Sequence, residues 1–376
     1  MNAGRLIAIL AVLGTMHAVA APPQGALDPA KGEPSPDGAI VWYDALELGL
    51  EGQGWSTGLK NPYDRLPAEA EGIVPPHVWG LSQQSAGLCV HFQTDSPSVS
   101  ARWSLRSDSL AMPHMPATGV SGLDLYVRHE GRWIWVANGR PAQTKDNEMS
   151  LKDAPEGLHE YLLYLPLYNG TESLRIGVAA GKTLAKASRP AERVKPVLVW
   201  GSSITQGGCA SRPGMAYPAI LGRRLDRPFI NLGFSGNGKM DPEVTRFIEK
   251  LDVAAYVIDC APNMTPESIT ERAEPLVRSL RAAHPDTPIV VVENVPYQQS
   301  FYLQGSRDGY TAKNAVLRAA YDRLVADGVK GLFYIPSTEL LGHDSESTVD
   351  GTHPNDLGFQ RMADAMEQTL RQALGQ

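Results

Sequence analysis

The sequence predicts two folded units of different class, an all-β sandwich or jelly roll followed by a doubly wound parallel α/β sheet. Residues 40–178 contain short runs in which apolar and polar residues alternate, a pattern typical of half-buried antiparallel strands. Residues 196–376 contain continuous apolar runs with helical patterns between them, as expected for parallel strands buried on both faces. A chain of 376 residues is long enough for two such units, each with its own core.

The composition argues against several classes of protein. The chain carries 34 basic and 41 acidic residues, and its net charge of −7 is not clustered, which disfavours a nucleic-acid-binding protein. Three cysteines are too few for a scaffold held by many disulfides. We find neither a metal-binding spacing of His and Cys nor a His-Glu-x-x-His motif, so we expect no metal and no cofactor.

The first 20 residues have the pattern of a secretory signal peptide. Arg5 precedes an apolar run over 6–13, and a cleavage site of the A-x-A type ends at Ala20. The apolar run is shorter than the roughly 20 residues that cross a membrane, and no later run reaches that length. We therefore expect cleavage near Ala20, a secreted or periplasmic protein, and no membrane span after cleavage. Residues 21–38, rich in Pro, Gly and Ala, are expected to lie loosely on the surface.

The β unit is expected over residues 39–182. Its strands are predicted at 88–94, 99–105, 123–128, 133–137, 160–165 and 174–178. No part of this region shows an apolar stripe at helical spacing. Six of the seven tryptophans fall here, and either core packing or stacking on sugar rings would explain them.

A polar and basic linker at 182–193 leads into the α/β unit, expected over 195–376. Its buried strands are predicted at 196–200, 229–232, 253–258, 289–292 and 332–335. Asp241 and Thr265 each precede a Pro and a Glu, which predicts a helix that the Asp or Thr side chain caps. Apolar stripes that begin at Leu317 and Phe359 predict two further helices.

Residues capable of chemistry follow the predicted parallel strands, at the edge where such sheets bind ligands. Ser203 follows the first strand, Gly236 the second, Asn263 the third, and Asp350 and His353 the last. Each has a plain alternative: an N-cap serine, an ordinary turn, an Asx turn, or a surface histidine. Because all five fall at one sheet edge, together they predict a nucleophile, a base with its orienting carboxylate, and donors for an oxyanion.

The order of these segments resembles the signature of the SGNH, or GDSL-type, hydrolase superfamily, from about residue 197 to the C-terminus. The resemblance implies a flavodoxin-like sheet with Ser203 as nucleophile and the family's D-x-x-H-P ending at Asp350 and His353. Where the family commonly has Gly-Asp-Ser, this chain has Gly-Ser-Ser, so Ser202 is a second candidate nucleophile. The spacing from the glycine and the following Ile-Thr favour Ser203.

The β half carries a resemblance of its own. Gly122-Leu-Asp-Leu-Tyr126 is similar to the G-x-D-L-Y motif of a β domain that precedes one bacterial branch of these esterases. The resemblance covers 39–182 as one domain. The family's third block commonly reads G-x-N-D, whereas here it reads Ala261-Pro-Asn263-Met, which keeps the amide but changes the turn around it.

The resemblance implies a metal-free serine esterase that works through an acyl-enzyme. His353 would take the proton of Ser203 and Asp350 would orient the imidazole. N–H groups of Ser203 and Gly236 and the amide of Asn263 would meet the oxyanion. Export and a tryptophan-bearing β unit suggest O-acetyl groups on a carbohydrate as the substrate. A lipid or lysophospholipid acylhydrolase, and a carbohydrate-binding protein with an inactive hydrolase domain, are the alternatives.

Several residues near these segments are weaker candidates. Arg212, Tyr217 and Tyr297 are candidates for contacts with a small-molecule or glycan ester. In the implied fold Cys209 and Cys260 both lie at the catalytic edge, so a disulfide between them is a candidate in an oxidising compartment. Cys89 is expected to be buried in a strand, and His114 and His343 are interpreted as surface or loop residues. The sequence leaves the oligomeric state open.

Overall fold

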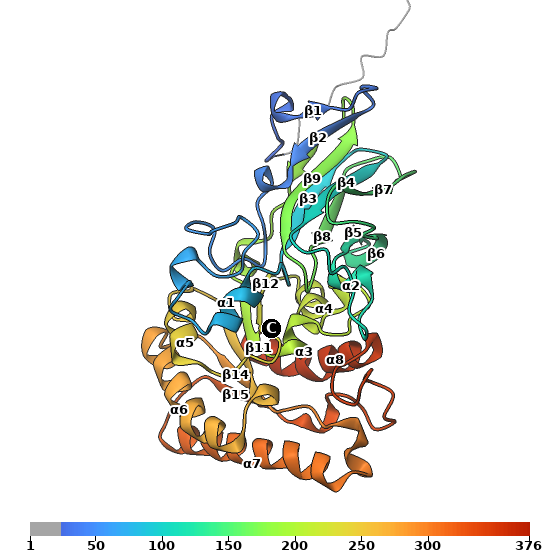
Figure 1. Ribbon diagram of the computed structural model, residues 1–376. Coiled ribbons are helices and arrows are strands. Elements are labelled where there is room, and N and C mark those ends of the chain that lie inside the picture. The colour runs from blue at the N-terminus through green and yellow to red at the C-terminus, as the bar shows by residue number, and fades with distance from the viewer. Residues whose placement is uncertain (1–23) are drawn as a thin grey trace, which may run out of the picture.

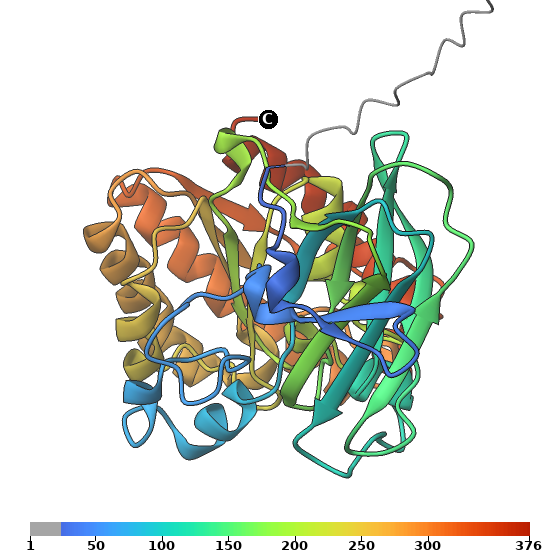
Figure 2. The same ribbon diagram turned by 90° about the horizontal axis from the view of Figure 1, so that it is seen from above.

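The computed structural model describes residues 24–376, so the predicted signal peptide lies outside the described residues. An all-β unit lies against an α/β unit, with the β unit uppermost in Figure 1 and to the right of the α/β unit in Figure 2. Between residues 24 and 376, no helix combines the length and the apolar character needed to cross a membrane.

The β unit is a sandwich of two antiparallel five-stranded sheets. One sheet has the order β1 (Glu33–Pro34), β2 (Ile40–Asp44), β9 (Thr171–Ala179), β4 (Val99–Leu105), β7 (Asn147–Leu151). The other has the order β10 (Leu184–Lys186), β3 (Cys89–Thr94), β8 (His159–Tyr164), β5 (Leu123–His129), β6 (Arg132–Gly139). Trp103 and Ile176 from the first sheet meet Phe92 and Leu125 from the second in one buried core. The alternation of apolar residues along the strands thus predicts the inward faces correctly.

Residues 24–38 are attached to the sandwich rather than loose. The N–H of Leu27 donates to the carbonyl of Leu184 at 2.8 Å, and β1 pairs with β2. The prediction of a loosely held segment over 21–38 is therefore wrong for its described part, because backbone pairing with β10 and β2 was not readable from its Pro- and Gly-rich composition.

The α/β unit contains a five-stranded parallel sheet of the flavodoxin-like order. Its strands, in spatial order, are β12 (Phe229–Gly233), β11 (Val197–Gly201), β13 (Ala255–Asp259), β14 (Ile289–Val292), β15 (Leu332–Ile335). One face packs on α5 (Pro242–Ile248), α6 (Pro266–Ala283), α7 (Gln304–Ala326), and the other on α4 (Tyr217–Arg224) and α8 (Asp356–Ala373). Burial on both faces explains the continuous apolar runs, and the predicted fold class is confirmed.

One of the two predicted helix caps is present. The Thr265 side chain accepts a hydrogen bond from the N–H of Ser268. The Ser268 hydroxyl oxygen in turn accepts one from the N–H of Thr265. Asp241 precedes α5 but makes no capping bond with its side chain. Its carboxylate accepts a bond from Arg272 on α6 at 2.8 Å instead, so a partner distant in sequence replaces the local one.

A segment from the N-terminal half packs on the α/β unit instead of the sandwich. Leu66 and the short helix α1 (Pro76–Ser82), with Val78 and Trp79, join the core beneath β12 and α5. The buried guanidinium of Arg65 donates to the carbonyls of Asn231 and Gly233, at 3.0 and 2.8 Å. This helix and the four-residue helix α2 (Ala117–Val120) are absent from the predicted pattern, because both are too short to show a periodicity.

Candidate active site

Ser203 stands at the turn between β11 and the short helix α3 (Ser203–Gln206). Ser202 is fully buried and its hydroxyl caps this helix by accepting the N–H of Ile204 at 3.2 Å. A Cβ at Gly201 would lie 2.0 Å from the hydroxyl oxygen of Thr205, so a glycine is required there. The two adjacent serines therefore have different positions: Ser202 caps the helix, and Ser203 presents its hydroxyl at the end of the strand.

His353 and Asp350 reach Ser203 from the loop before α8. The Ser203 Oγ lies 2.9 Å from Nε2 of His353, and Nδ1 of the same ring lies 2.7 Å from Oδ2 of Asp350. The other carboxylate oxygen of Asp350 accepts the N–H groups of Thr352 and His353, at 3.0 and 2.8 Å. Partial burial raises the pKa of Asp350, but the bonds from His353 and Thr352 outweigh it, so the pKa lies below its ordinary value.

The ionised carboxylate of Asp350 decides which atoms donate and which accept in the hydrogen bonds from Asp350 through His353 to Ser203. Because an ionised carboxylate only accepts hydrogen bonds, the Nδ1 of His353 carries the proton that faces Asp350. The Nε2 then bears the lone pair that faces the hydroxyl of Ser203. The arrangement prepares Nε2 to accept a proton from Oγ.

Gly236 and Asn263 follow β12 and β13, the two strands that flank β11. Gly236 adopts a φ of +69°, which favours glycine, and open space surrounds the place of a Cβ. The Oδ1 of Asn263 accepts the N–H of Gly238 at 3.2 Å, which fixes the orientation of the amide. Neither the N–H of Gly236 nor the Nδ2 of Asn263 donates to any other residue between 24 and 376, so both remain available as donors.

Tyr217 is not at the substrate side of the site. Its side chain is fully buried, and its hydroxyl donates to Oδ2 of Asp259 at 2.8 Å and contacts Thr205 Oγ1 at 3.1 Å. The Thr205 hydroxyl also donates to Oδ2 of Asp259 at 2.8 Å, and burial raises the pKa of Asp259 to about 7 despite the bonds from Tyr217 and Thr205. Thr205, Tyr217 and Asp259 thus connect α3 to β13 in the interior of the unit. The prediction of a substrate contact for Tyr217 is therefore wrong.

Arg212 belongs to the contact between the two units rather than to the site. Its Nη1 donates to Oδ2 of Asp124 at 2.7 Å and to the hydroxyl of Tyr126 at 2.5 Å. Asp124 and Tyr126 are the Asp and Tyr of the G-x-D-L-Y motif on β5, and the guanidinium stacks 5.3 Å from the ring of Trp135. The prediction of a substrate contact for Arg212 is corrected, because its partner is a buried carboxylate from the other unit.

Tyr297 lies on the loop after β14, close to the catalytic turn. The N–H of the next residue, Gln298, donates to the carbonyl of Gly351 at 2.9 Å, while Lys313 donates to the Tyr297 hydroxyl. Sequence reasoning missed the pair that follows: Phe301 and Tyr302 are 78% and 82% exposed, the largest exposed fractions among the large apolar side chains of residues 24–376. No periodicity marks them, because they stand at the end of a four-residue 3-10 helix, Gln298–Phe301, which is too short to show one.

The predicted disulfide is absent. Cys209 and Cys260 are both free, as is Cys89, and all three are buried. The thiol of Cys260 donates to the carbonyl of Trp200, while burial raises the pKa of the Cys209 thiol to about 12. The Sγ of Cys209 lies within 4.8 Å of a ring nitrogen of His353 instead of bonding to Cys260.

His114 is exposed and lies on a turn, as predicted, but it also lies next to His353, which was not predicted. Its ring centroid lies 5.9 Å from that of His353. It stands on the turn between Met112 and Met115, whose backbones exchange two hydrogen bonds. No local pattern in the sequence shows that this turn of the β unit reaches across to His353.

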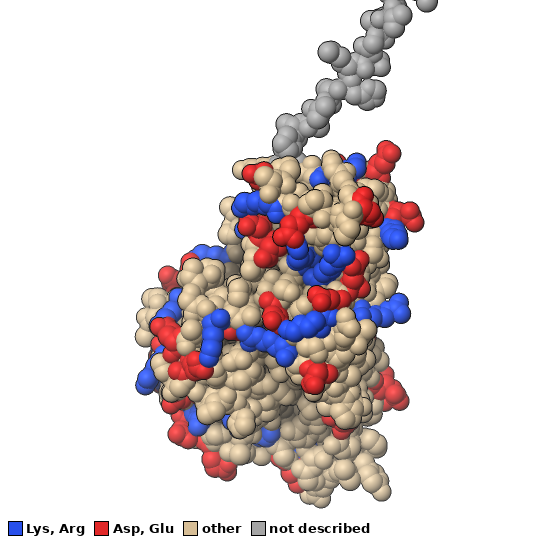
Figure 3. Space-filling model, turned by 45° about the horizontal axis from the view of Figure 1, so that its top comes forward, with Lys and Arg blue, Asp and Glu red and all other residues tan. Residues whose placement is uncertain are grey.

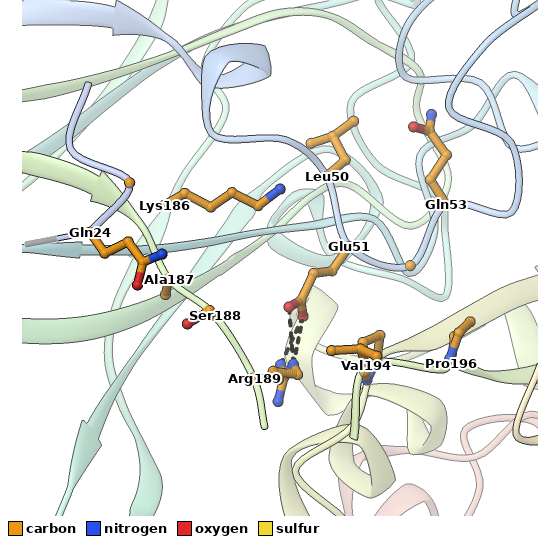
Figure 4. A pocket seen from close by; sticks show the side chains of 13 residues that line it. Gln24, Leu50, Glu51, Gln53, Lys186, Ala187, Ser188, Arg189, Val194 and Pro196 are labelled. Atoms are coloured by element: carbon orange, nitrogen blue, oxygen red, sulfur yellow. Dashed lines mark hydrogen bonds and ion pairs between the residues drawn. The ribbon is translucent and has the colours of Figure 1, made fainter. Parts of the chain in front are cut away.

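At the opposite end of the parallel sheet, charged residues surround a cavity. A cavity of about 470 Å³ lies near the residues that precede β11 and β12, and Figure 4 shows Glu51 and Arg189 paired beside it. Arg189 also pairs with Asp226, and Glu51 with His91, both at 2.8 Å. On the face drawn in Figure 3, acidic and basic side chains are interspersed. Glu51, Arg189, Asp226 and His91 are thus paired with one another, in contrast to the free donors at Gly236 and Asn263.

Comparisons with known proteins agree with this architecture. A model of the GDSL-like lipase/acylhydrolase family matches residues 194–371, and a model of the N-terminus of SGNH-hydrolase-type esterases (GxDLY) matches residues 40–184. The crystal structure of a GDSL-like lipase from Bacteroides ovatus is 38% identical, with a TM-score of 0.84 over 89% of this chain and 98% of that one. No curated protein matches the sequence.

Two more distant structures share the fold. The salicylyl-acyltransferase SsfX3 from a tetracycline biosynthetic pathway is 20% identical, with a TM-score of 0.70 over 92% of this chain and 97% of that one. A family two carbohydrate esterase from Clostridium thermocellum, in complex with cellohexaose, is 16% identical, with a TM-score of 0.56 over 77% of this chain and 93% of that one.

Proposed function

This chain belongs to the GDSL-like lipase/acylhydrolase family and is an esterase, and on that premise we propose that it removes O-acetyl groups from a carbohydrate, with Ser203 as the nucleophile, after export from the cytoplasm. The observation that carries the proposal is the hydrogen-bonded chain from Asp350 through His353 to Ser203, at 2.7 and 2.9 Å. The donors at Gly236 and Asn263 follow β12 and β13, the two strands that flank the strand before Ser203.

The geometry supports acyl transfer in two steps. His353 Nε2 takes the proton of Ser203 as Oγ attacks the ester carbonyl, and the resulting oxyanion accepts bonds from N–H groups of Ser203 and Gly236 and from Asn263. When the carbon–oxygen bond to the leaving alcohol breaks, His353 returns its proton to that alcohol. Water then attacks the acyl-serine, again with His353 as the base, and releases the carboxylic acid and the free hydroxyl.

Small residues support a small acyl group. Gly208 lies beside His353, where a Cβ would stand 3.5 Å from the imidazole Cδ2, and Gly236 and Asn263 follow the two strands that flank β11. None of these residues offers the wide apolar surface that a long acyl chain would need for burial. A lipid acylhydrolase is therefore the less favoured alternative.

The exposed pair Phe301 and Tyr302 supports a carbohydrate as the alcohol. The loop that carries them is hydrogen-bonded to the catalytic turn through Gln298 and Gly351, so the rings stand near the rim of the site. Aromatic faces stack on the C–H groups of sugar rings. The carbohydrate esterase of similar fold, crystallised with cellohexaose, is a further reason to test such substrates.

The decisive experiment compares the two adjacent serines. We expect Ser203→Ala to abolish hydrolysis of p-nitrophenyl acetate, because the nucleophile is lost, while the melting temperature stays near that of the parent. Ser202→Ala is the matched control: loss of the helix cap costs about 1 kcal/mol of stability but leaves the nucleophile in place. Full activity of Ser203→Ala would overturn the assignment.

The acyl and alcohol preferences are tested separately. Activity on acetate, butyrate and longer p-nitrophenyl esters should fall steeply with chain length, and a rise would favour the lipid alternative. Release of acetate from a panel of acetylated plant and bacterial glycans tests the carbohydrate. Glycan binding by Ser203→Ala without turnover by the parent would favour a binding protein with an inactive site.

A further inference from the structure

Three potential metal ligands meet beside Ser203, although they come from different parts of the chain. One ring nitrogen each of His114 and His353 and the Sγ of Cys209 all lie within 4.8 Å of one another. His114 comes from the β unit, Cys209 from the turn after α3, and His353 from the loop before α8. We propose that these three side chains form a site for a borderline or soft divalent cation such as Zn²⁺, and that its occupation switches the esterase off.

The donor set fits such a cation. Imidazole nitrogen and thiolate sulfur are the ligands that Zn²⁺ prefers, and two His and one Cys leave a fourth position open to water or to the Ser203 hydroxyl. With bonds of about 2.0–2.1 Å to nitrogen and about 2.3 Å to sulfur, neighbouring ligand atoms in a tetrahedral site stand about 3.5 Å apart. The exposed His114 side chain can close the remaining gap by rotation.

The surrounding structure holds the ligands in place. Oδ2 of Asp350 bonds the Nδ1 of His353, which directs the lone pair of Nε2 into the site, as carboxylates do behind metal-bound histidines. Cys209 keeps its side chain there at a φ of +75°, a conformation that would favour a glycine. The hydroxyl of Thr118, near His114, donates to the carbonyl of Ser211 at 2.6 Å and fastens the β-unit loop to the Cys209 turn.

Metal binding and catalysis both need the lone pair on Nε2 of His353, so they exclude each other. The cation forms a bond to the Nε2 lone pair of His353 and a bond to the sulfur of Cys209, whose proton is released to water. While Nε2 is bound to the metal it cannot accept the proton of Ser203, so the nucleophile is not activated. The inhibition rests on the proposed function, whereas the binding of the cation does not.

Inhibition is measured by titrating Zn²⁺ into p-nitrophenyl acetate hydrolysis in a buffer free of chelators, and reversing it with EDTA. Without metal, Cys209→Ala should hydrolyse the ester as the parent does, and its half-inhibitory Zn²⁺ concentration should rise by at least about tenfold. His114→Asn should show a similar rise, and because His114 is exposed its loss does not endanger folding. Cys89→Ala, which removes a buried thiol from β3 in the sandwich, is the matched control and should leave the inhibition unchanged.

A binding experiment separates this proposal from the esterase assignment. Co²⁺ titrated into Ser203→Ala, which keeps all three ligands, should give the near-ultraviolet charge-transfer band of a cobalt–thiolate bond. The band should be absent in the double variant with Cys209→Ala. No band in Ser203→Ala, or equal Zn²⁺ inhibition of the parent and Cys209→Ala, would overturn the metal site. A band in a chain without esterase activity would uphold the site and refute the proposed function instead.

Discussion

Two of the histidines between residues 24 and 376, His353 and His91, form hydrogen bonds with carboxylates but differ in their second partner. At the carboxyl end of the parallel sheet, His353 bonds one carboxylate and one hydroxyl, and its side chain is 26% exposed. Between the two units, His91 bonds two carboxylates, Glu51 at 2.8 Å and Glu160 at 2.6 Å, and its side chain is 2% exposed.

The number of carboxylate acceptors around each imidazole ring decides whether the ring can serve as a base. With acceptors on both nitrogens, His91 must donate twice and is held as the cation. Burial lowers its pKa, but the bonds from Glu160 and Glu51 outweigh burial and raise it above the ordinary value. With a hydroxyl on one side, His353 keeps a lone pair and can act as a base. A carboxylate beside a histidine therefore indicates catalysis only when the second nitrogen is left to accept a proton.

The largest expected effect comes from Asp350→Asn. The side-chain oxygen can still accept the N–H groups of Thr352 and His353, but the amide now donates to Nδ1 of His353 and forces the proton onto Nε2. Nε2 then faces Ser203 as an N–H donor and cannot accept the serine proton. We expect kcat for p-nitrophenyl acetate to fall on the order of 10³–10⁴-fold at an unchanged melting temperature. A fall of less than about tenfold would show that the carboxylate does not set the tautomer.

At the other histidine we expect a loss of stability and not of activity. His91→Gln removes the cation between Glu51 and Glu160, while Glu51 keeps Arg189 and Glu160 keeps Arg128, so the free energy of unfolding should fall by about 2 kcal/mol. Urea unfolding measures this change, and kcat of the folded variant should equal that of the parent. His129→Gln, at an exposed position at the end of β5, is the control and should change neither quantity.

The stability difference should also depend on pH. Because the folded-state pKa of His91 is raised, its stabilising contribution is complete below the unfolded value of about 6.5 and is lost as pH rises through the folded value. The facing groups Glu51, Arg189 and Asp226 keep their charges throughout, since the pKa values of both carboxyls are lowered and that of the guanidinium is raised. The gap between parent and His91→Gln should therefore be widest near pH 6 and shrink toward pH 9. A constant gap would mean that His91 is neutral in the folded protein.

The smallest effect is expected from Arg212→Lys, at the contact between the units. Lys keeps the charge beside Asp124 but loses the stack on Trp135 and the fork that also reaches Tyr126, which should cost about 1 kcal/mol of stability. The KM for a glycan ester should not change. If KM rises while the melting temperature stays constant, Arg212 contacts the substrate, as the sequence alone had suggested.

The sequence predicted the parts of this protein that depend on neighbouring residues. The inward faces of β3 and β4, the buried parallel strands and the Thr265 cap were readable because periodicity and capping are local. The segments with Ser203, Asn263 and His353 could be placed at one sheet edge because a parallel sheet brings its strand ends together. Where a partner came from far along the chain, local reasoning failed: Asp241 bonds Arg272 rather than its own helix, and Tyr217 is buried against Asp259.

By itself, then, the sequence determined the two-unit architecture and the fold class of each unit. It also determined the identity and the order along the chain of the residues proposed for catalysis. The tertiary structure alone decided that Ser202 caps a helix while Ser203 presents its hydroxyl to His353. It also decided that Cys209 faces His353 and His114 rather than Cys260. The physical reason is that a strand end fixes where a backbone stands. Which side chains meet there depends on packing between segments that no local pattern connects.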